Sequence, residues 1–301
     1  MQEEYIRLKP NFFIAAANNI YGEFIMKKIL LLICIIYGVV SNYVASLFYI
    51  EPLAHIKPSD ERTDISHLTE KAVSDYTAED YELIFQQTGL GKAAVDSLAS
   101  PLLLMAYQES YFAEIEFTCT MNSPISFEER IENSPVLLAP LEDGDVLITN
   151  SSHVFSWRNG HAAIVVDADN GITLEAVVIG KNSKMQDTDK WRHYPNFVVL
   201  RLKDAKKEER AAIARSAYDY LNDIPYVATI GVIPAKYSEL EITSGTQCAH
   251  LVWLAYAAHG YDIDSDRGMI VTPNDILESE LFEVVQVYGT GQMISPPFMR
   301  R

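Results

Sequence analysis

The chain has 301 residues, of which 49% are hydrophobic and 22% charged, and its formal net charge is −17. This length and composition fit one large folded core, alone or with a small appendage, and exclude wholesale disorder. Beyond residue 50 there are 24 − 4 = 20 basic and 41 − 3 = 38 acidic residues, a net charge of −18. Because such a surface repels phosphate backbones, we expect no nucleic-acid partner.

Residues 1–50 are predicted to be an N-terminal extension that contains a signal peptide or a membrane anchor. Lys27 and Lys28 precede an uncharged stretch from Ile29 to Ile50. A basic start and an apolar run are typical of a secretory signal peptide, whereas about 20 apolar residues also suffice to cross a bilayer. Either alternative predicts an extracytoplasmic protein, secreted or associated with the membrane through residues 29–50. Met26 is an alternative start to Met1.

The next two segments carry no recognisable catalytic constellation. Residues 51–65 contain two prolines and mixed charges and are predicted to be a linker. Residues 66–135 are predicted to be a helical preface. Its first helix opens at Thr77, with acidic residues following, and closes at Gly89. A second helix is expected from Leu102 to Ile115.

Residues 136–301 have the pattern of an α+β domain. Runs of β-branched and aromatic residues bounded by turn residues predict strands, and helical spacing predicts two helices. The strands are Val146–Thr149, His161–Val166, Ile172–Ile179, Phe197–Leu202 and Phe282–Tyr288; the helices are Glu208–Leu221 and Cys248–His259. A mostly antiparallel sheet packed on the cysteine-bearing helix is therefore expected.

Cys248 lies in the first turn of an apolar helix that begins after Gly245. Free backbone N–H groups and the helix dipole favour a thiolate there and supply one arm of an oxyanion hole. The alternative is an inert core cysteine. Three cysteines are too few for a disulfide framework, and a bond between Cys119 and Cys248 would consume the candidate nucleophile.

A catalytic thiol needs a base, and the nearest histidines are badly placed. His250 lies about 200° around the helix from Cys248, and His259 lies roughly 16 Å along it. His161, at the start of a strand, is the predicted base, with His153 as its competitor. A metal site of His153, His161 and Cys248 is a poor alternative, because this spacing fits no usual ligand pair. No cofactor is expected.

Strand parity suggests the third group. If residues 167–171 form a five-residue loop, Val166 faces Ile172 and Glu175 faces Ala163. Glu175 then shares the face of His161 and lies within reach of its ring. A loop with an even number of residues would turn Glu175 to the opposite face.

The chain resembles the YiiX/YebB-like branch of the NlpC-type, papain-like cysteine hydrolases with circularly permuted topology. The resemblance rests on GDVLIT at 144–149, GHAAIVVDA at 160–168, LEAV at 174–177 and QCAHLVWLAY at 247–256, and it spans roughly residues 140–290. It implies a permuted papain-like fold with Cys248 as nucleophile, His161 as base, Glu175 as the orienting residue and Tyr226 as an active-site tyrosine. A core position for Tyr226 is the alternative.

The predicted function is hydrolysis of an amide bond in a cell-wall peptide or an acylated amino acid. The expected partners are a peptide, an acyl amide or a lipid-like substrate. Two alternatives stay open: a lipid-directed thioesterase or acyltransferase that uses the same triad, and a membrane-anchored binding module with a dead site. The second requires His161 or Glu175 to lie out of reach of Cys248.

Overall fold

The computed structural model describes residues 26–40, 55–58, 61–154 and 157–290. The chain divides into two compact units, Met1–Pro52 and Leu53–Arg301. In the first unit, residues 26–40 form a helix. Within the described ranges, no helix is both long and apolar enough to span a membrane. The predicted signal or anchor at residues 29–50 extends beyond residue 40, so its second half lies outside the described residues.

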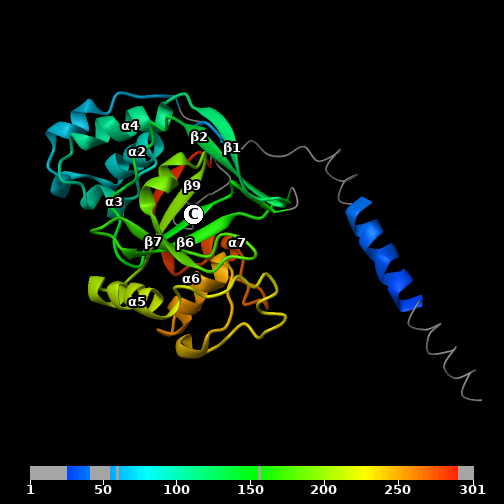
Figure 1. Ribbon diagram of the computed structural model, residues 1–301. Helices are drawn as coiled ribbons and strands as arrows, with labels where there is room; N and C mark the ends of the chain where they lie inside the picture. Colours follow the sequence, from blue (N-terminus) through cyan, green and yellow to red (C-terminus); the bar gives the residue numbers. More distant parts are fainter. Residues whose placement is uncertain (1–25, 41–54, 59–60, 155–156, 291–301) are drawn as a thin grey trace, which may run out of the picture. The chain divides into compact units, whose positions relative to one another are not determined.

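A six-stranded antiparallel sheet forms the centre of the second unit, with the strand order β10-β9-β3-β6-β7-β8 (Figure 1). All five strand pairs are antiparallel. The strands are β3 (Val146–Thr149), β6 (His161–Asp167), β7 (Ile172–Glu175), β8 (Lys184–Asp187), β9 (Phe197–Leu202) and β10 (Phe282–Tyr288). The α+β class with an antiparallel sheet is thus confirmed.

Three helices cover one face of this sheet: α5 (Lys207–Tyr220), α6 (Cys248–Ala257) and α7 (Pro273–Leu277). Every residue of α6 from Cys248 to Tyr256 is buried, as its apolar sequence predicts. Its side chains pack with Ala162 and Ile164 of β6 in one core cluster. The strand and the cysteine helix are therefore held together by burial of apolar surface on both.

The opposite face is covered by short helical elements that belong to a second core cluster. They are η1 (Ser66–Glu70), η2 (Val73–Asp75), α2 (Ala78–Thr88), α3 (Lys92–Asp96), α4 (Leu103–Phe112) and η3 (Thr188–His193); a further turn, η4, spans Leu240–Ile242. The predicted cap at Thr77 is present as a full capping box with Asp80, and α2 ends at Gly89 with φ 71°. Ala163 and Val165 of β6 point into this cluster.

A second antiparallel sheet, in the order β1-β2-β4-β5, joins the preface to the rest of the unit. Its strands are β1 (Glu116–Ser123), β2 (Ser126–Glu132), β4 (Ser152–Val154) and β5 (Trp157–Arg158). Residues 116–132 are thus a hairpin and not part of a helical segment. Their alternating β-branched and aromatic residues favour strands, and pairing with β4 provides the third strand that an isolated hairpin lacks.

Three other expectations need correction. Ile65 is fully buried, and the His55 ring is hydrogen-bonded to Pro195 O at 2.8 Å, so the described ends of the expected linker 51–65 pack against the fold. The expected strand 172–179 stops at Glu175, after which the chain turns toward β8. The boundary at residue 136 does not separate two units, because the preface shares its core with β6 and β9.

Candidate active site

The amino end of α6 positions Cys248. Gln247 is the N-cap, and its Oε1 accepts hydrogen bonds from the Ala249 backbone N at 2.9 Å and from the Cys248 thiol at 3.4 Å. Its Nε2 donates to Val271 O at 2.6 Å, so the cap is itself anchored. The thiol, which is 4% exposed, is held beside the free N–H groups of the first helical turn.

His161 is the first residue of β6 and is 2% exposed. It follows Gly160, whose φ of 72° suits glycine and whose Cβ, if present, would lie 3.0 Å from Thr149 O. The imidazole stacks on the Trp191 ring, with centroids 5.8 Å apart and planes 14° from parallel. Backbone geometry and an aromatic wall together fix the orientation of the ring.

The carboxylate of Glu175 is completely buried and faces His161. The Nε2 atom of His161 donates a hydrogen bond to Glu175 Oε2 at 2.7 Å. Lys190 Nζ donates to the same oxygen at 2.6 Å, and Trp191 Nε1 donates to Oε1 at 3.1 Å. The predicted register of β6 and β7 is present where Ile164 pairs with Leu174, so Glu175 shares the face of His161 as parity predicts.

The Cys248 side chain interacts with the His161 imidazole and is one of the groups that raise the pKa of the ring. Since Nε2 is taken by Glu175, Nδ1 is the ring nitrogen left for the sulfur. Alternate residues of β6 point to opposite faces, so His161 belongs with Ala163 on the preface face, whereas Cys248 belongs to the α6 core cluster. Thiol and imidazole therefore come from opposite faces and meet at the first residue of the strand.

Burial and charge act in opposite directions on His161. Burial alone would lower the pKa of the imidazole, but its interaction with the Cys248 side chain, its hydrogen bond to Glu175 and the Glu175 charge outweigh burial and raise the pKa to about 9. Burial alone would likewise raise the pKa of Glu175, but Lys190 and His161 hold it far below its usual range. At neutral pH the arrangement is an imidazolium beside a carboxylate.

Tyr226 lies next to this arrangement, on the segment that pairs with Thr246 just before α6. Burial, followed by the electrostatic effect of Cys248, raises the pKa of its phenol above the ordinary value. Within the described part of the chain its hydroxyl makes no hydrogen bond. Tyr226 is thus a partly buried neutral donor that interacts electrostatically with Cys248.

The competing residues lie elsewhere. His153, in β4, stacks on Phe127 with centroids 4.2 Å apart and faces Glu129 at 3.2 Å. The His250 ring is hydrogen-bonded to Lys236 O at 2.6 Å, away from the thiol as helical geometry predicts. Cys119 is exposed in β1, and neither it nor Cys248 is in a disulfide bond.

No metal-binding group is formed by His153, His161 and Cys248 among the described residues. The one such group found in these ranges combines Asp264, Asp266 and Asp275, whose oxygens lie within 4.8 Å of one another. Asp264 is already paired with the ammonium group of Lys236. The dead-site alternative requires His161 or Glu175 to lie out of reach of Cys248, and the interaction of the imidazole with both side chains does not favour it.

Sequence reasoning missed the groups that surround the triad residues. Lys190 and Trp191, which are hydrogen-bonded to Glu175, lie on the short helix η3. No hydrophobic periodicity in the sequence predicts this helix. Glu128 in β2 is buried, paired with Arg130, and within electrostatic reach of His161. Its burial could only follow from the hairpin, which was expected to be helical. The signal available in the sequence was the arginine two residues after Glu128.

Comparison with known proteins yields little. No family model matches the chain, and no curated protein matches it. One solved structure aligns, entitled crystal structure of metalloprotein yiiX from Escherichia coli O157:H7, DUF1105, with 16% identity over 48% of this chain and 97% of that one. Its TM-score is 0.38, a likeness that carries no argument about activity. The YiiX part of the expected resemblance has this weak counterpart, and membership of the NlpC-type family stays a prediction.

Proposed function

We propose that the chain is a cysteine hydrolase in which Cys248 is the nucleophile, His161 the general acid and base, and Glu175 the residue that orients the imidazole. The observation that supports this most directly is the hydrogen bond of His161 Nε2 to Glu175 at 2.7 Å, together with the interaction of the same imidazole with the Cys248 side chain. A nucleophile, a base and an orienting group in one chain of contacts are what acyl transfer by a thiol requires.

The proposed cycle has two halves. In the first, the sulfur of Cys248 attacks an amide carbonyl, the N–H groups at the start of α6 stabilise the oxyanion, and the Nδ1–H of His161 protonates the leaving amine. In the second, the neutral imidazole takes a proton from water, which attacks the thioester and releases the acid. The Tyr226 hydroxyl is a further donor for the oxyanion.

The sequence resemblance supports a permuted papain-like fold and an amide substrate, either a cell-wall peptide or an acylated amino acid. The test is a screen of muropeptides and N-acyl amino acids by mass spectrometry with the full chain in detergent. We expect turnover by the wild type and by Cys119→Ala, which removes an exposed cysteine, and none by Cys248→Ala. Equal turnover by Cys248→Ala would refute the proposal.

A lipid-directed acyl substrate is the second candidate, and a specific surface feature favours it. The segment after Tyr226 exposes Ile233 by 75%, and the adjoining segment exposes Met269 by 69%. The two segments approach each other at Gly231, where an added Cβ would lie 1.8 Å from Met269 O. Faster hydrolysis of long-chain than of acetyl thioesters would support this candidate over the first.

We also propose an extracytoplasmic location, supported by the two lysines and the uncharged stretch that follows them in the sequence. Fractionation of cells that express the full chain tests it. Recovery of the protein outside the cytoplasm or in the membrane is expected, and recovery in the cytoplasm alone would contradict it.

A further inference from the structure

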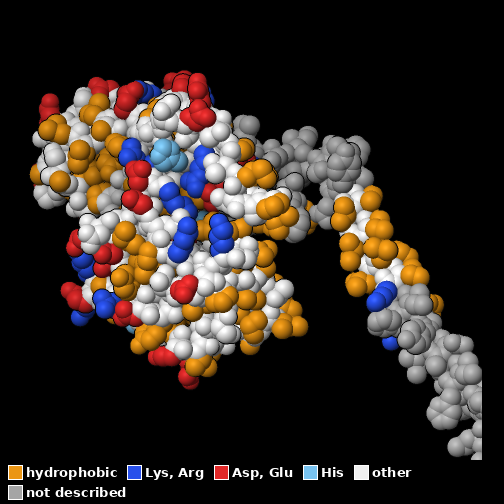
Figure 2. All heavy atoms as spheres, in the orientation of Figure 1, with side chains coloured by type: hydrophobic (Ala, Val, Ile, Leu, Met, Phe, Trp, Pro, Cys, Tyr) orange, Lys and Arg blue, Asp and Glu red, His pale blue; other side chains and the backbone are white. Residues whose placement is uncertain are grey.

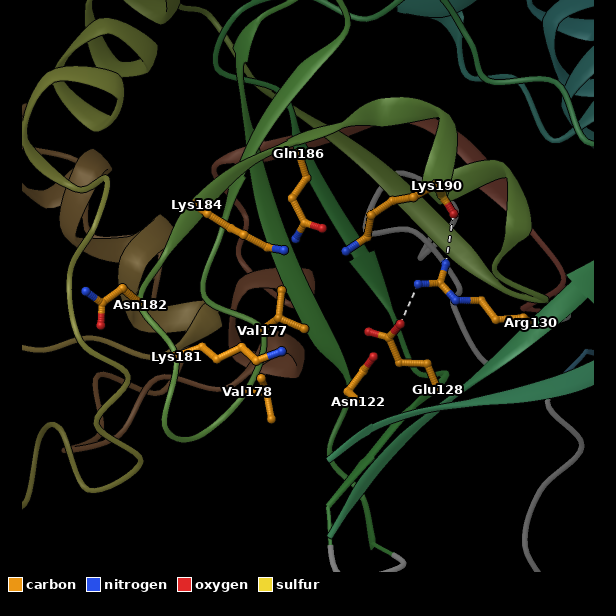
Figure 3. Close-up of a pocket in the computed structure, with 10 residues that line it drawn as sticks. All are labelled: Asn122, Glu128, Arg130, Val177, Val178, Lys181, Asn182, Lys184, Gln186 and Lys190. Carbon is orange, nitrogen blue, oxygen red and sulfur yellow. Dashed lines mark hydrogen bonds and ion pairs between the residues drawn. The ribbon is translucent and has the colours of Figure 1, made fainter. Parts of the chain in front are cut away.

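A cavity of about 110 Å³ is lined by the residues drawn in Figure 3, and it lies next to the buried carboxylate of Glu175 because two of these residues contact that carboxylate. Two residues of its wall contact that carboxylate: Lys190 at 2.6 Å and Gln186 at 3.2 Å. The wall is formed by the β2 strand, the turn after β7, the β8 strand and η3; its residues include Glu128, Arg130, Lys181, Lys184, Gln186 and Lys190. The cavity thus adjoins the proposed triad on the face that carries His161 and Glu175.

The same cavity is tied to the other side of the site. Lys181 O accepts a hydrogen bond from the Tyr226 backbone N at 3.1 Å, and the Thr246 N bonds to Pro225 O at 3.0 Å. One short run of backbone contacts therefore leads from the cavity wall to the residue two before Cys248. This run of backbone contacts connects the cavity wall with the segment that carries Cys248.

The charges in the cavity do not cancel. Arg130 is paired with Glu128, and Lys190 with Glu175. Lys181 and Lys184 make no ion pair with any residue that the structure describes, which leaves a net charge of +2. Lys184 stands opposite Glu175 in the β7–β8 register, so its side chain is on the cavity face. In Figure 3 the ammonium groups of Lys181, Lys184 and Lys190 point into the same space.

This local excess of positive charge contrasts with the net charge of the whole chain, which is −17. Figure 2 shows Lys and Arg side chains gathered at the centre of the face in view, over the region where β6 and β7 are labelled in Figure 1. Like charges placed together repel each other unless a counter-charge is supplied. Two unpaired ammonium groups at a small polar cavity are an arrangement that a bound anion completes.

We propose that the substrate carries an anionic group, a carboxylate or a phosphate, close to the scissile amide, and that Lys181 and Lys184 bind it in this cavity. The inference rests on the proposed function, since it concerns the substrate of that same site. Lys190 and Arg130 complete the basic wall, while their own carboxylate partners keep them in place. Neutral acyl amides of the same shape are poor substrates by this account.

The probes are iodoacetamides that carry, on alkyl linkers of graded length, a terminal carboxylate, a phosphonate or a neutral carboxamide. The rate of alkylation of Cys248 is followed by peptide mass spectrometry on the full chain. We expect the anionic probes to react about five- to tenfold faster than the carboxamide, since each exposed ion pair adds a small increment. A preference for carboxylate or for phosphonate identifies the source of the anion.

In the double variant Lys181→Gln/Lys184→Gln, the ratio of the alkylation rate with the anionic probes to the rate with the carboxamide should fall close to one. The rate with the carboxamide itself should not change. The matched control is Lys206→Gln/Lys207→Gln, with the same change of charge. Lys206 and Lys207 lie at the start of α5, whereas the cavity residue Asn182 contacts Asp223 beyond its far end, about 21 Å away along a 14-residue helix. The control should keep the preference.

Equal rates for all three probes, or a preference that survives in the Lys181→Gln/Lys184→Gln protein, would overturn the anion proposal. That failure is distinguishable from failure of the proposed function. If the carboxamide probe still labels Cys248 in a manner that depends on His161, the nucleophile stands and only the substrate class is wrong.

Discussion

The Nε2 atom of His161 donates a hydrogen bond to Glu175 at 2.7 Å, and the partner carboxylate is completely buried. This contact selects which ring nitrogen faces Cys248. A buried carboxylate that also accepts bonds from Lys190 and Trp191 has little freedom to move. The orientation of the imidazole is therefore set from behind, by groups that do not touch the sulfur.

Glu175→Gln should lower kcat/KM about 10- to 100-fold, because loss of one charge-assisted hydrogen bond costs about 1.5–3 kcal/mol. The glutamine keeps the shape of the side chain, so thermal melts should show a folded protein. Kinetics on any substrate found in the screen give the measurement. If activity is unchanged in a folded variant, the orienting role belongs to another group.

At pH 6, iodoacetamide should label Cys248 faster than Cys119, although Cys119 is exposed and Cys248 buried. An imidazolium beside a thiol favours the reactive thiolate, whereas an isolated cysteine with a pKa of about 8.5 reacts slowly at that pH. In His161→Gln the rate at Cys248 should fall at least about tenfold, and the rate at Cys119 should not change. Quantitative mass spectrometry of the two cysteine-containing peptides measures both alkylation rates, with Cys119 as the internal reference. A rate at Cys248 that does not exceed the rate at Cys119 would contradict the prediction.

The stability of the wild type relative to His161→Gln should depend on pH. The pKa of His161 is raised from 6.5 to about 9 in the folded chain, so its contribution is complete below pH 6.5 and is lost as the pH rises through 9. The full contribution is roughly 3 kcal/mol. Chemical unfolding of both proteins between pH 6 and pH 10 measures it, and a pH-independent difference would count against the proposed imidazolium.

Tyr226→Phe should lower kcat about 10- to 100-fold and leave KM and Tm nearly unchanged. Its hydroxyl makes no hydrogen bond within the described residues, so removal of the hydroxyl costs little stability. If the same hydroxyl stabilises the oxyanion, the loss appears in the transition state alone. An equal change in Tyr256→Phe would contradict this, because Tyr256 is hydrogen-bonded to Gly144 O in the core.

The parts of the fold that could be predicted are those with a strong local period. β3, β9 and β10 begin and end where their β-branched runs do. The register of β6 and β7 followed from loop length, although a bulge places Asp167 and not Val166 opposite Ile172. Because the bulge lies next to the turn, it does not disturb the pairing of Ile164 with Leu174, and the side of the sheet on which Glu175 lies was predicted correctly.

The parts that escaped prediction depend on contacts distant in the sequence. The β1–β2 hairpin is stabilised by pairing with β4, and no local sequence pattern predicts that β4 is its partner. Lys190 and Trp191 lie on a single turn of helix whose position follows from the end of β8. The cavity beside Glu175 combines residues from β2, β8 and η3, so its charge could be known only after the fold.

The meeting of Cys248 and His161 at the end of β6 has a consequence for assembly. The thiol is anchored in the core on one face of the sheet and the imidazole in the core on the other, so neither layer alone contains a site. The proposed reaction therefore requires both layers to be packed on the sheet. Partial unfolding that releases either α6 or the preface layer should abolish activity before the sheet unfolds. Activity would then report on the tertiary packing of both layers.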